Sequence, residues 1–126
     1  MLIDSDVLIW VLRGNAKAAR LIDKTPDRRI SIVTFMELLQ GARDKRESRL
    51  IREFLTDFGF RTLPLTENIG HRAAIYIEEY SLASGLRTAD ALIAATAAEN
   101  GLTLCTGDRT HYRAIRDLAL ESFRSS

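Results

Sequence analysis

The segment that decides the fold is Met1-Leu-Ile-Asp-Ser-Asp-Val-Leu-Ile9, in which an apolar run passes directly into acidic residues. Residues 1–4 are short and apolar before the first carboxylate, which is typical of a buried strand. Ser5 or Asp6 can cap a helix over 7–13, because short polar side chains accept hydrogen bonds from the free N–H groups of a first helical turn. The chain therefore opens with a strand that leads straight into a helix, with carboxylates at the junction.

The same pattern recurs along the rest of the chain. Further strands are predicted at 29–33, 60–65, 102–105 and 118–120. Helices are predicted between and around them, over 16–23, 35–42 (with Thr34 as the expected cap), 50–58, 68–83, 88–99 and 111–117. Strands that alternate with helices indicate a central, mostly parallel sheet flanked by helices, in one α/β domain that spans residues 1–126.

The composition is that of an ordinary globular protein, with 46% hydrophobic and 28% charged residues and a formal net charge of +1. No strong overall field therefore attracts nucleic acid or an anionic membrane. Arginine supplies 15 of the 18 basic residues. It is a good partner for phosphate, but a GC-rich genome, which favours arginine and alanine codons, explains the bias equally well. The single cysteine, Cys105, is expected to pack in the core of a protein from a reducing compartment. No signal peptide or membrane-spanning run is visible, so a cytoplasmic location is expected.

Acidic side chains follow the predicted strands at the point where each strand ends. Asp4 ends the first strand, Glu37 lies one turn beyond the second, and Asp108 follows the fourth. Asp90 lies in the first turn of an alanine-rich helix whose N-terminus can face the same edge. Ligands of open parallel sheets bind beyond the carboxyl ends of the strands, so we expect these four carboxylates to converge there.

Each of these acids alone has an ordinary explanation as a helix cap, a partner of the helix dipole or a partner of a surface arginine. As a set they are harder to explain in that way. Asp90 opens the most apolar helix of the chain, where an unpaired carboxylate is costly, and Glu37 is expected opposite the apolar face of its helix. Carboxylates that converge raise one another's pKa values, and a hard divalent cation such as Mg²⁺ or Mn²⁺ relieves that repulsion. Such an ion suits the hydrolysis of phosphodiesters.

Four segments of the chain together resemble the motifs of the PIN-domain nucleases. They are Met1-Leu-Ile-Asp-Ser-Asp-Val-Leu-Ile9, Thr34-Phe-Met-Glu-Leu-Leu-Gln-Gly-Ala42, Arg87-Thr-Ala-Asp-Ala-Leu-Ile-Ala-Ala95 and Leu104-Cys-Thr-Gly-Asp-Arg-Thr-His-Tyr112. The short, single-domain form looks most like the VapC toxins of toxin–antitoxin pairs. One position departs from the family pattern: the last motif often carries a second acid where this chain has His111, so only Asp108 is carried over as the fourth acid.

The resemblance implies a Mg²⁺- or Mn²⁺-dependent endoribonuclease that acts on RNA, forms a homodimer and is blocked by a cognate antitoxin. The implied catalytic and metal-binding residues are Asp4, Glu37, Asp90 and Asp108. Supporting residues would be Ser5, Asp6 and Thr106. Three arginines near these motifs are candidates for guiding RNA phosphates, although solvated helix charges explain them equally well: Arg87, Arg109 and Arg113.

Two other functions fit parts of the pattern. Asp4-Ser-Asp6 is similar to the Asp-x-Asp of phosphotransfer enzymes and phosphatases with an aspartyl nucleophile, but those usually carry Thr where this chain has Leu8. A non-catalytic RNA-binding module on the same fold is the second alternative, and the presence of all four acids argues against it. His71 and His111 are candidates for a general base, but a surface or packing role is expected for both, because a site of carboxylates and metal does not need a histidine. A dinucleotide enzyme is excluded, because no Gly-x-Gly-x-x-Gly occurs.

Overall fold

The computed structural model describes all 126 residues, and its centre is a five-stranded sheet in which every pair of neighbouring strands is parallel. The strands are β1 (Leu2–Ile3), β2 (Arg29–Ser31), β3 (Arg61–Leu63), β4 (Leu104–Thr106) and β5 (Leu120–Ser122). Their order is β3-β2-β1-β4-β5. The chain therefore adds β2 and β3 on one side of β1, and then crosses over to add β4 and β5 on the other side of β1. The pair β1/β4 is the switch point, where ligand sites of such sheets form. The predicted α/β class and parallel sheet are confirmed.

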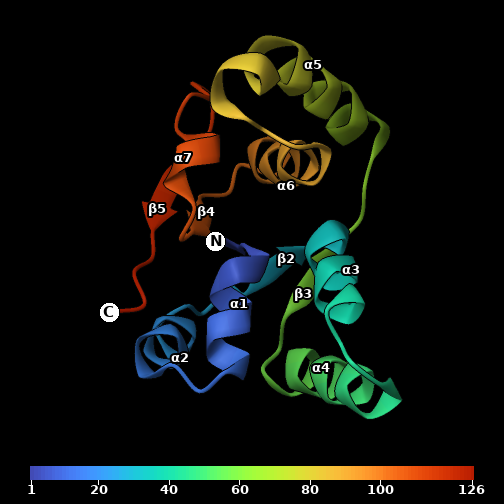
Figure 1. Cartoon of the computed structure of the whole chain (residues 1–126), viewed down its shortest axis with the longest axis vertical. Coiled ribbons are helices and arrows are strands. Elements are labelled where there is room, and N and C mark those ends of the chain that lie inside the picture. The colour runs from blue at the N-terminus through green and yellow to red at the C-terminus, as the bar shows by residue number, and fades with distance from the viewer.

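Seven helices surround the sheet, and Figure 1 shows them in two groups, with α5, α6 and α7 on one side and α1 to α4 on the other. They are α1 (Ser5–Leu12), α2 (Ala16–Asp23), α3 (Ile32–Gln40), α4 (Lys45–Asp57), α5 (Glu67–Ser84), α6 (Thr88–Glu99) and α7 (Arg109–Tyr112). None of the seven combines the length and the hydropathy that crossing a membrane requires.

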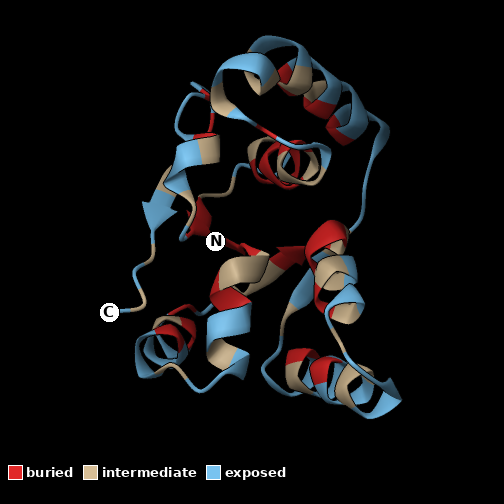
Figure 2. Ribbon diagram, in the orientation of Figure 1, coloured by how far each residue is buried: buried red, intermediate tan, exposed pale blue.

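Successive strand residues pack into two separate cores, because side chains alternate between the faces of a sheet. Leu2 and Leu104 belong to the core beneath α5, α6 and α7, whereas Ile3 and Cys105 belong to the core beneath α1 to α4. Figure 2 shows the buried residues concentrated on the strands and on the helix faces turned toward them. Helix α6 is buried almost all round, as its alanine-rich sequence predicts. Burial raises the pKa of the Cys105 thiol to about 12, which agrees with its predicted role in the core.

The predicted cap and start of the first helix are wrong, because α1 begins directly after β1. Helix α1 starts at Ser5 rather than at residue 7. The N-cap is Asp4, whose side chain accepts a hydrogen bond from the backbone N–H of Ser5 at 2.8 Å. Neither Ser5 nor Asp6 is the cap, since both lie inside the first turn.

The predicted cap of the helix over 35–42 is also wrong. Helix α3 begins at Ile32, and its N-cap is Ser31, whose hydroxyl accepts a hydrogen bond from the N–H of Val33 at 3.0 Å. Thr34 lies within the helix, is fully buried and finds no hydrogen-bond partner in the protein for its hydroxyl. The β-branched residues Ile32 and Val33 extended the predicted strand by two residues that belong to the helix.

The remaining elements lie close to their predicted positions. Helices α2 and α6 have the predicted bounds, 16–23 and 88–99. Helix α4 starts five residues earlier than predicted, after Asp44, which accepts a hydrogen bond from the N–H of Glu47 at 2.8 Å. The last helix was predicted over 111–117, but α7 begins two residues earlier, at Arg109, and already ends at Tyr112. Strand β5 begins two residues beyond the predicted start of the last strand.

Candidate acidic site at the switch point

Asp4 is the buried centre of the candidate site, with 5% of its surface exposed. Beyond the bond from Ser5 to Oδ1, its Oδ2 accepts a hydrogen bond from the hydroxyl of Thr106 at 2.8 Å. Because Asp4 directly follows β1 and Thr106 ends β4, this bond joins the two strands at the switch point. Burial and the charge of Asp6 raise the pKa of Asp4 to about 7, and the charge of Glu37 adds to the shift.

Asp6 lies beside Asp4, in the first turn of α1. Its carboxylate accepts hydrogen bonds from the N–H of Val7 at 2.8 Å and from that of Gly107 at 2.9 Å. A β-carbon at position 107 would lie 2.7 Å from Oδ2 of Asp6, so only glycine allows this close approach without a shift. Burial raises the pKa of Asp6, and the charge of Asp108 contributes.

Glu37 reaches the same edge from α3. Its Oε1 accepts a hydrogen bond from the hydroxyl of Ser5 at 3.1 Å. Burial raises the pKa of Glu37, and the charges of Asp90 and Asp6 raise it further. Glu37 therefore lies near carboxylates from two other segments of the chain.

Asp108 follows β4 and is the residue from which α7 starts. Its backbone N–H donates to the Thr106 hydroxyl oxygen at 3.0 Å. The same hydroxyl donates to Asp4, so Thr106 connects the two acids through one oxygen atom. The Oδ2 of Asp108 lies 2.7 Å from Nδ1 of His111.

Asp90 is held in the first turn of α6 by two hydrogen bonds. Its Oδ2 accepts one from the backbone N–H of Arg87 at 3.2 Å, and its Oδ1 accepts one from the hydroxyl of Tyr112 at 3.2 Å. The Nδ1 of His111 lies 3.8 Å from Oδ2 of Asp90. His111 therefore stands between Asp90 and Asp108.

Sequence reasoning missed two residues that border the acids. His111 was expected on the surface or in ordinary packing, but it contacts both Asp90 and Asp108. Its position three residues after Asp108, one helical turn away, was a usable signal. Tyr112 is 1% exposed, and burial together with the charges of Asp4 and Asp90 raises the pKa of its hydroxyl. Nothing in the sequence distinguished Tyr112 from a core tyrosine.

The acids of the site lack cationic partners. No lysine or arginine forms an ion pair with Asp4, Asp6, Glu37, Asp90 or Asp108. The three arginines predicted near the motifs are exposed, and none of their guanidinium groups forms an ion pair: Arg87, Arg109 and Arg113. Negative charge is thus gathered here without compensation from the protein, apart from the imidazole of His111.

The chemistry of the donor set suits a hard divalent cation. Carboxylates and a hydroxyl offer only oxygen, which Mg²⁺ and Mn²⁺ prefer. No three His, Cys, Asp or Glu side chains lie close enough together to hold an ion directly among them. Mg²⁺ commonly retains several waters and binds through only one or two carboxylates, so an ion held partly through water fits these residues.

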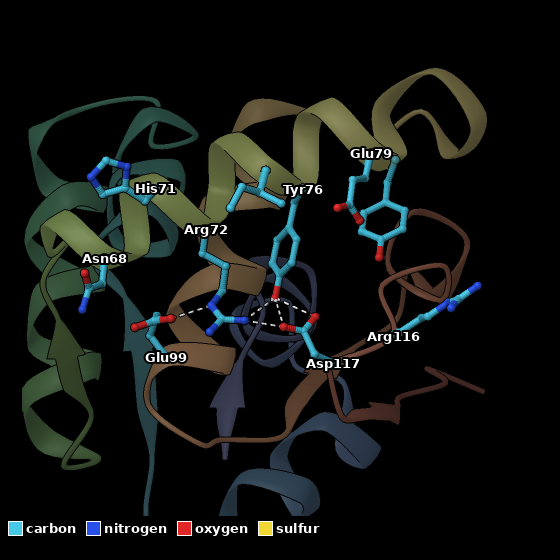
Figure 3. Close-up of a pocket in the computed structure, with 10 residues that line it drawn as sticks. Asn68, His71, Arg72, Tyr76, Glu79, Glu99, Arg116 and Asp117 are labelled. Atoms are coloured by element: carbon cyan, nitrogen blue, oxygen red, sulfur yellow. Dashed lines mark hydrogen bonds and ion pairs between the residues drawn. The ribbon is translucent and has the colours of Figure 1, made fainter.

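A second polar cluster differs from the site in its charge balance. Figure 3 shows Arg72 of α5 donating to Glu99 at 2.5 Å and to Asp117, with the Tyr76 hydroxyl 3.0 Å from each carboxylate oxygen of Asp117. It borders an open cavity of about 510 Å³. One guanidinium bridges two carboxylates, so the cluster ties α5, α6 and the segment after α7 together, and each of its charged groups has an ion-pair partner within the protein.

A groove of about 690 Å³ runs between α1, α3 and α4, with Glu37 on its wall. Its apolar lining includes Ile9, Leu12 and Leu50, which are 38%, 43% and 50% exposed. Large apolar side chains left this accessible are typical of surfaces that a partner covers. The groove meets the acidic site at Glu37.

The fold and the site define a class: an α/β protein with an acidic centre at the carboxyl ends of its central parallel strands. The chain belongs to the PIN-domain family, whose model matches residues 1–117. A chain in a toxin–antitoxin complex from Klebsiella pneumoniae is 27% identical, with a TM-score of 0.79 over 94% of each chain. FitAcB from Neisseria gonorrhoeae contains a chain 27% identical, with a TM-score of 0.72 over 98% of this chain and 96% of that one.

VapBC2 from Rickettsia felis, solved with a DNA fragment from its promoter, contains a chain with the same fold. That chain is 18% identical, with a TM-score of 0.81 over 98% of both chains. No curated protein sequence matches this chain.

Proposed function

We propose that this protein is a metal-dependent endoribonuclease and the toxin of a toxin–antitoxin pair. The observation that carries the proposal is the convergence of carboxylates from four separate segments at the β1/β4 edge, without a lysine or arginine to balance them. Membership of the PIN-domain family and the likeness to a chain of a toxin–antitoxin complex from Klebsiella pneumoniae support it.

In this proposal Asp4, Glu37, Asp90 and Asp108 hold Mg²⁺ or Mn²⁺, directly or through water. When bound, the ion polarises a phosphoryl oxygen and lowers the pKa of an attacking water. The chain's own groups prepare the site. Thr106 orients Asp4 and positions the backbone of Asp108. Such supporting hydrogen bonds orient metal ligands and strengthen binding.

Glu37 is the residue best placed to accept a proton from the attacking water. Its Oε1 is held by the hydroxyl of Ser5, while its Oε2 has no hydrogen-bond partner in the protein. A pKa raised by burial brings a carboxylate closer to the range in which a general base works efficiently.

RNA cleavage tests the proposal. Purified protein should cut structured RNA in the presence of Mg²⁺ or Mn²⁺ and leave it intact in EDTA. Asp4→Asn and Asp90→Asn should each reduce the cleavage rate by about 100-fold or more, since each removes a charged ligand. Asp57→Asn on the exposed end of α4 is the matched control.

Cleavage that persists in EDTA or in the Asp4→Asn variant would refute this assignment of the active site. Release of phosphate from small phosphomonoesters would instead favour the phosphatase alternative. RNA binding without cleavage under any metal condition would favour the non-catalytic module.

The proposal includes a cognate antitoxin, because the similar chain from Klebsiella pneumoniae belongs to a structure described as a toxin–antitoxin complex. The groove beside α1, α3 and α4 fits an amphipathic segment of such a partner. Apolar side chains of the segment would cover Leu12 and Leu50, and a cationic side chain would reach Glu37. A homodimer, implied by the family resemblance, should sediment at twice the monomer mass.

A further inference from the structure

A patch of basic side chains lies on the far side of α1 from the groove, and the site described above does not use it. Lys17 and Arg20 lie three residues apart on α2, Lys24 is the C-cap of that helix four residues further on, and Arg124 follows β5. We call these four residues the α2 basic patch. Together with Leu21, Ser122 and Phe123 they line a shallow concavity of about 430 Å³ that contains no acidic side chain.

The α2 basic patch has no internal compensation. None of its four cations forms an ion pair or a side-chain hydrogen bond, whereas Arg28, Arg29 and Arg72 are all engaged in such contacts. The only acid of α2, Asp23, does not line the concavity. Like charges one helical turn apart repel each other and weaken a helix. A concave surface that gathers cations at this cost, in a chain with a net charge of only +1, suits a polyanion.

The patch is continuous with the acidic site through the C-terminal segment. Ser122 pairs with Thr106 in the sheet, and the N–H of Phe123 donates to the carbonyl oxygen of Thr106 at 2.9 Å. Thr106 is the residue that holds Asp4. The next residue along, Arg124, already belongs to the patch.

The C-terminal segment is also fixed against α2. The side-chain amide of Asn15, the N-cap of α2, donates to the carbonyl oxygen of Ser125 at 3.0 Å. Figure 1 shows the segment running from the end of β5 toward α2. The α2 basic patch thus begins at Arg124, two residues after the pairing of Ser122 with Thr106. Hydrogen bonds hold the C-terminal segment both to β4 and to the start of α2.

We infer that the α2 basic patch binds backbone phosphates of the RNA substrate on one side of the cleaved bond. The inference rests on the proposed nuclease function and adds the path along which the RNA leaves the acidic site. Lysine and arginine contacts to phosphate contribute affinity that depends on salt and carry no sequence information. The patch would therefore strengthen binding of RNAs long enough to reach it and leave the chemical step unchanged.

The test compares two charge-reversal variants. Arg20→Glu/Lys24→Glu alters the patch, and Arg46→Glu/Arg49→Glu changes the net charge equally on α4, where both arginines are exposed and unpaired. The Kd for a labelled RNA of about 20 nucleotides is measured in EDTA at several salt concentrations, which separates binding from cleavage. With metal present, kcat and KM are measured for the same RNA and for an oligonucleotide too short to reach α2. Thermal unfolding verifies the fold, and Arg20→Ala/Lys24→Ala replaces the reversal variant if that variant unfolds.

The patch variant should raise the Kd about tenfold and reduce the slope of log Kd against log salt by about 1.5, as expected for losing two phosphate contacts. KM should rise on the long RNA only, with kcat and the short substrate unaffected, and the α4 variant should stay near wild type. Equal Kd values and slopes for the two variants, or no RNA affinity in the wild type, would overturn the inference. Salt-dependent RNA binding through the patch without metal-dependent cleavage would instead refute the proposed function and leave the phosphate site standing.

Discussion

Asp4 has two opposing effects on the stability of the fold. As the N-cap of α1 it satisfies a backbone N–H, which stabilises the fold. As a buried carboxylate near Asp6 and Glu37, it is disfavoured in its charged form, and its pKa rises to about 7. Sites that bind cations often keep such a charge at the expense of stability.

Asp4→Asn should therefore stabilise the metal-free protein, by an amount that depends on pH. The pKa of the carboxyl is 3.8 in the unfolded chain and about 7 in the folded one. Below pH 3.8 the group is protonated in both states and folding carries no penalty, whereas above pH 7 it is charged in both states and the folded state is destabilised by the full amount. The free energy of unfolding should rise by about 2–4 kcal/mol near pH 8 and hardly at all near pH 4. Urea unfolding in EDTA measures it, with Asp57→Asn as control. A gain that is the same at both pH values would contradict the assigned burial and repulsion.

Thr106→Val should impair both the site and the fold, because one hydroxyl serves Asp4 and Asp108. Its loss leaves a carboxylate oxygen and a backbone N–H without their partner, at a cost of about 1–3 kcal/mol. Metal-dependent cleavage should fall by about 10- to 100-fold, as for other groups that orient metal ligands. Thr106→Ser keeps the hydroxyl and should retain most activity in the same assay. Full activity of Thr106→Val would rule out this positioning role.

At the scale of elements, strands that run directly into helices bring the acids to one edge. Strand β1 passes into α1 at Asp4, and β2 passes into α3 at Ser31. The sequence predicted α2 and α6 well, since Asn15 caps one and Gly101 follows the other in the left-handed conformation. The start of α3 was not predictable in this way. Ile32 and Val33 favour a strand by local preference, and the end of β2 is set by its pairing with β3.

Two substitutions test whether Ser31 rather than Thr34 is the N-cap of α3. Ser31→Ala should lower the free energy of unfolding by about 1 kcal/mol, because the N–H of Val33 loses its acceptor. Thr34→Val should be neutral or stabilising, since the Thr34 hydroxyl is buried without a partner. Chemical denaturation of both variants gives the comparison. The reverse order of stabilities would restore Thr34 as the cap.

At the scale of the whole molecule, the strand order determines which acids meet. The sequence shows that Asp4, Glu37 and Asp108 follow predicted strands and that Asp90 opens an apolar helix, so these four acids could be selected as candidates from the sequence alone. The neighbouring positions of β1 and β4 depend on the crossover connections, which local patterns do not specify. The contacts of His111 and Tyr112 depend on the orientation of the short helix α7, and for that reason they became visible only in the structure.

The central claim is that four distant segments form one cation site, and direct titration of Mn²⁺ tests it without any substrate. Calorimetry would compare the wild type with Asp4→Asn, Glu37→Gln, Asp90→Asn and Asp108→Asn, and with Asp57→Asn as control. A single shared site predicts that each of the four substitutions weakens Mn²⁺ binding by about tenfold or more, while the control binds like the wild type. Unchanged Mn²⁺ affinity in the variants of two or more of these segments would contradict the claim.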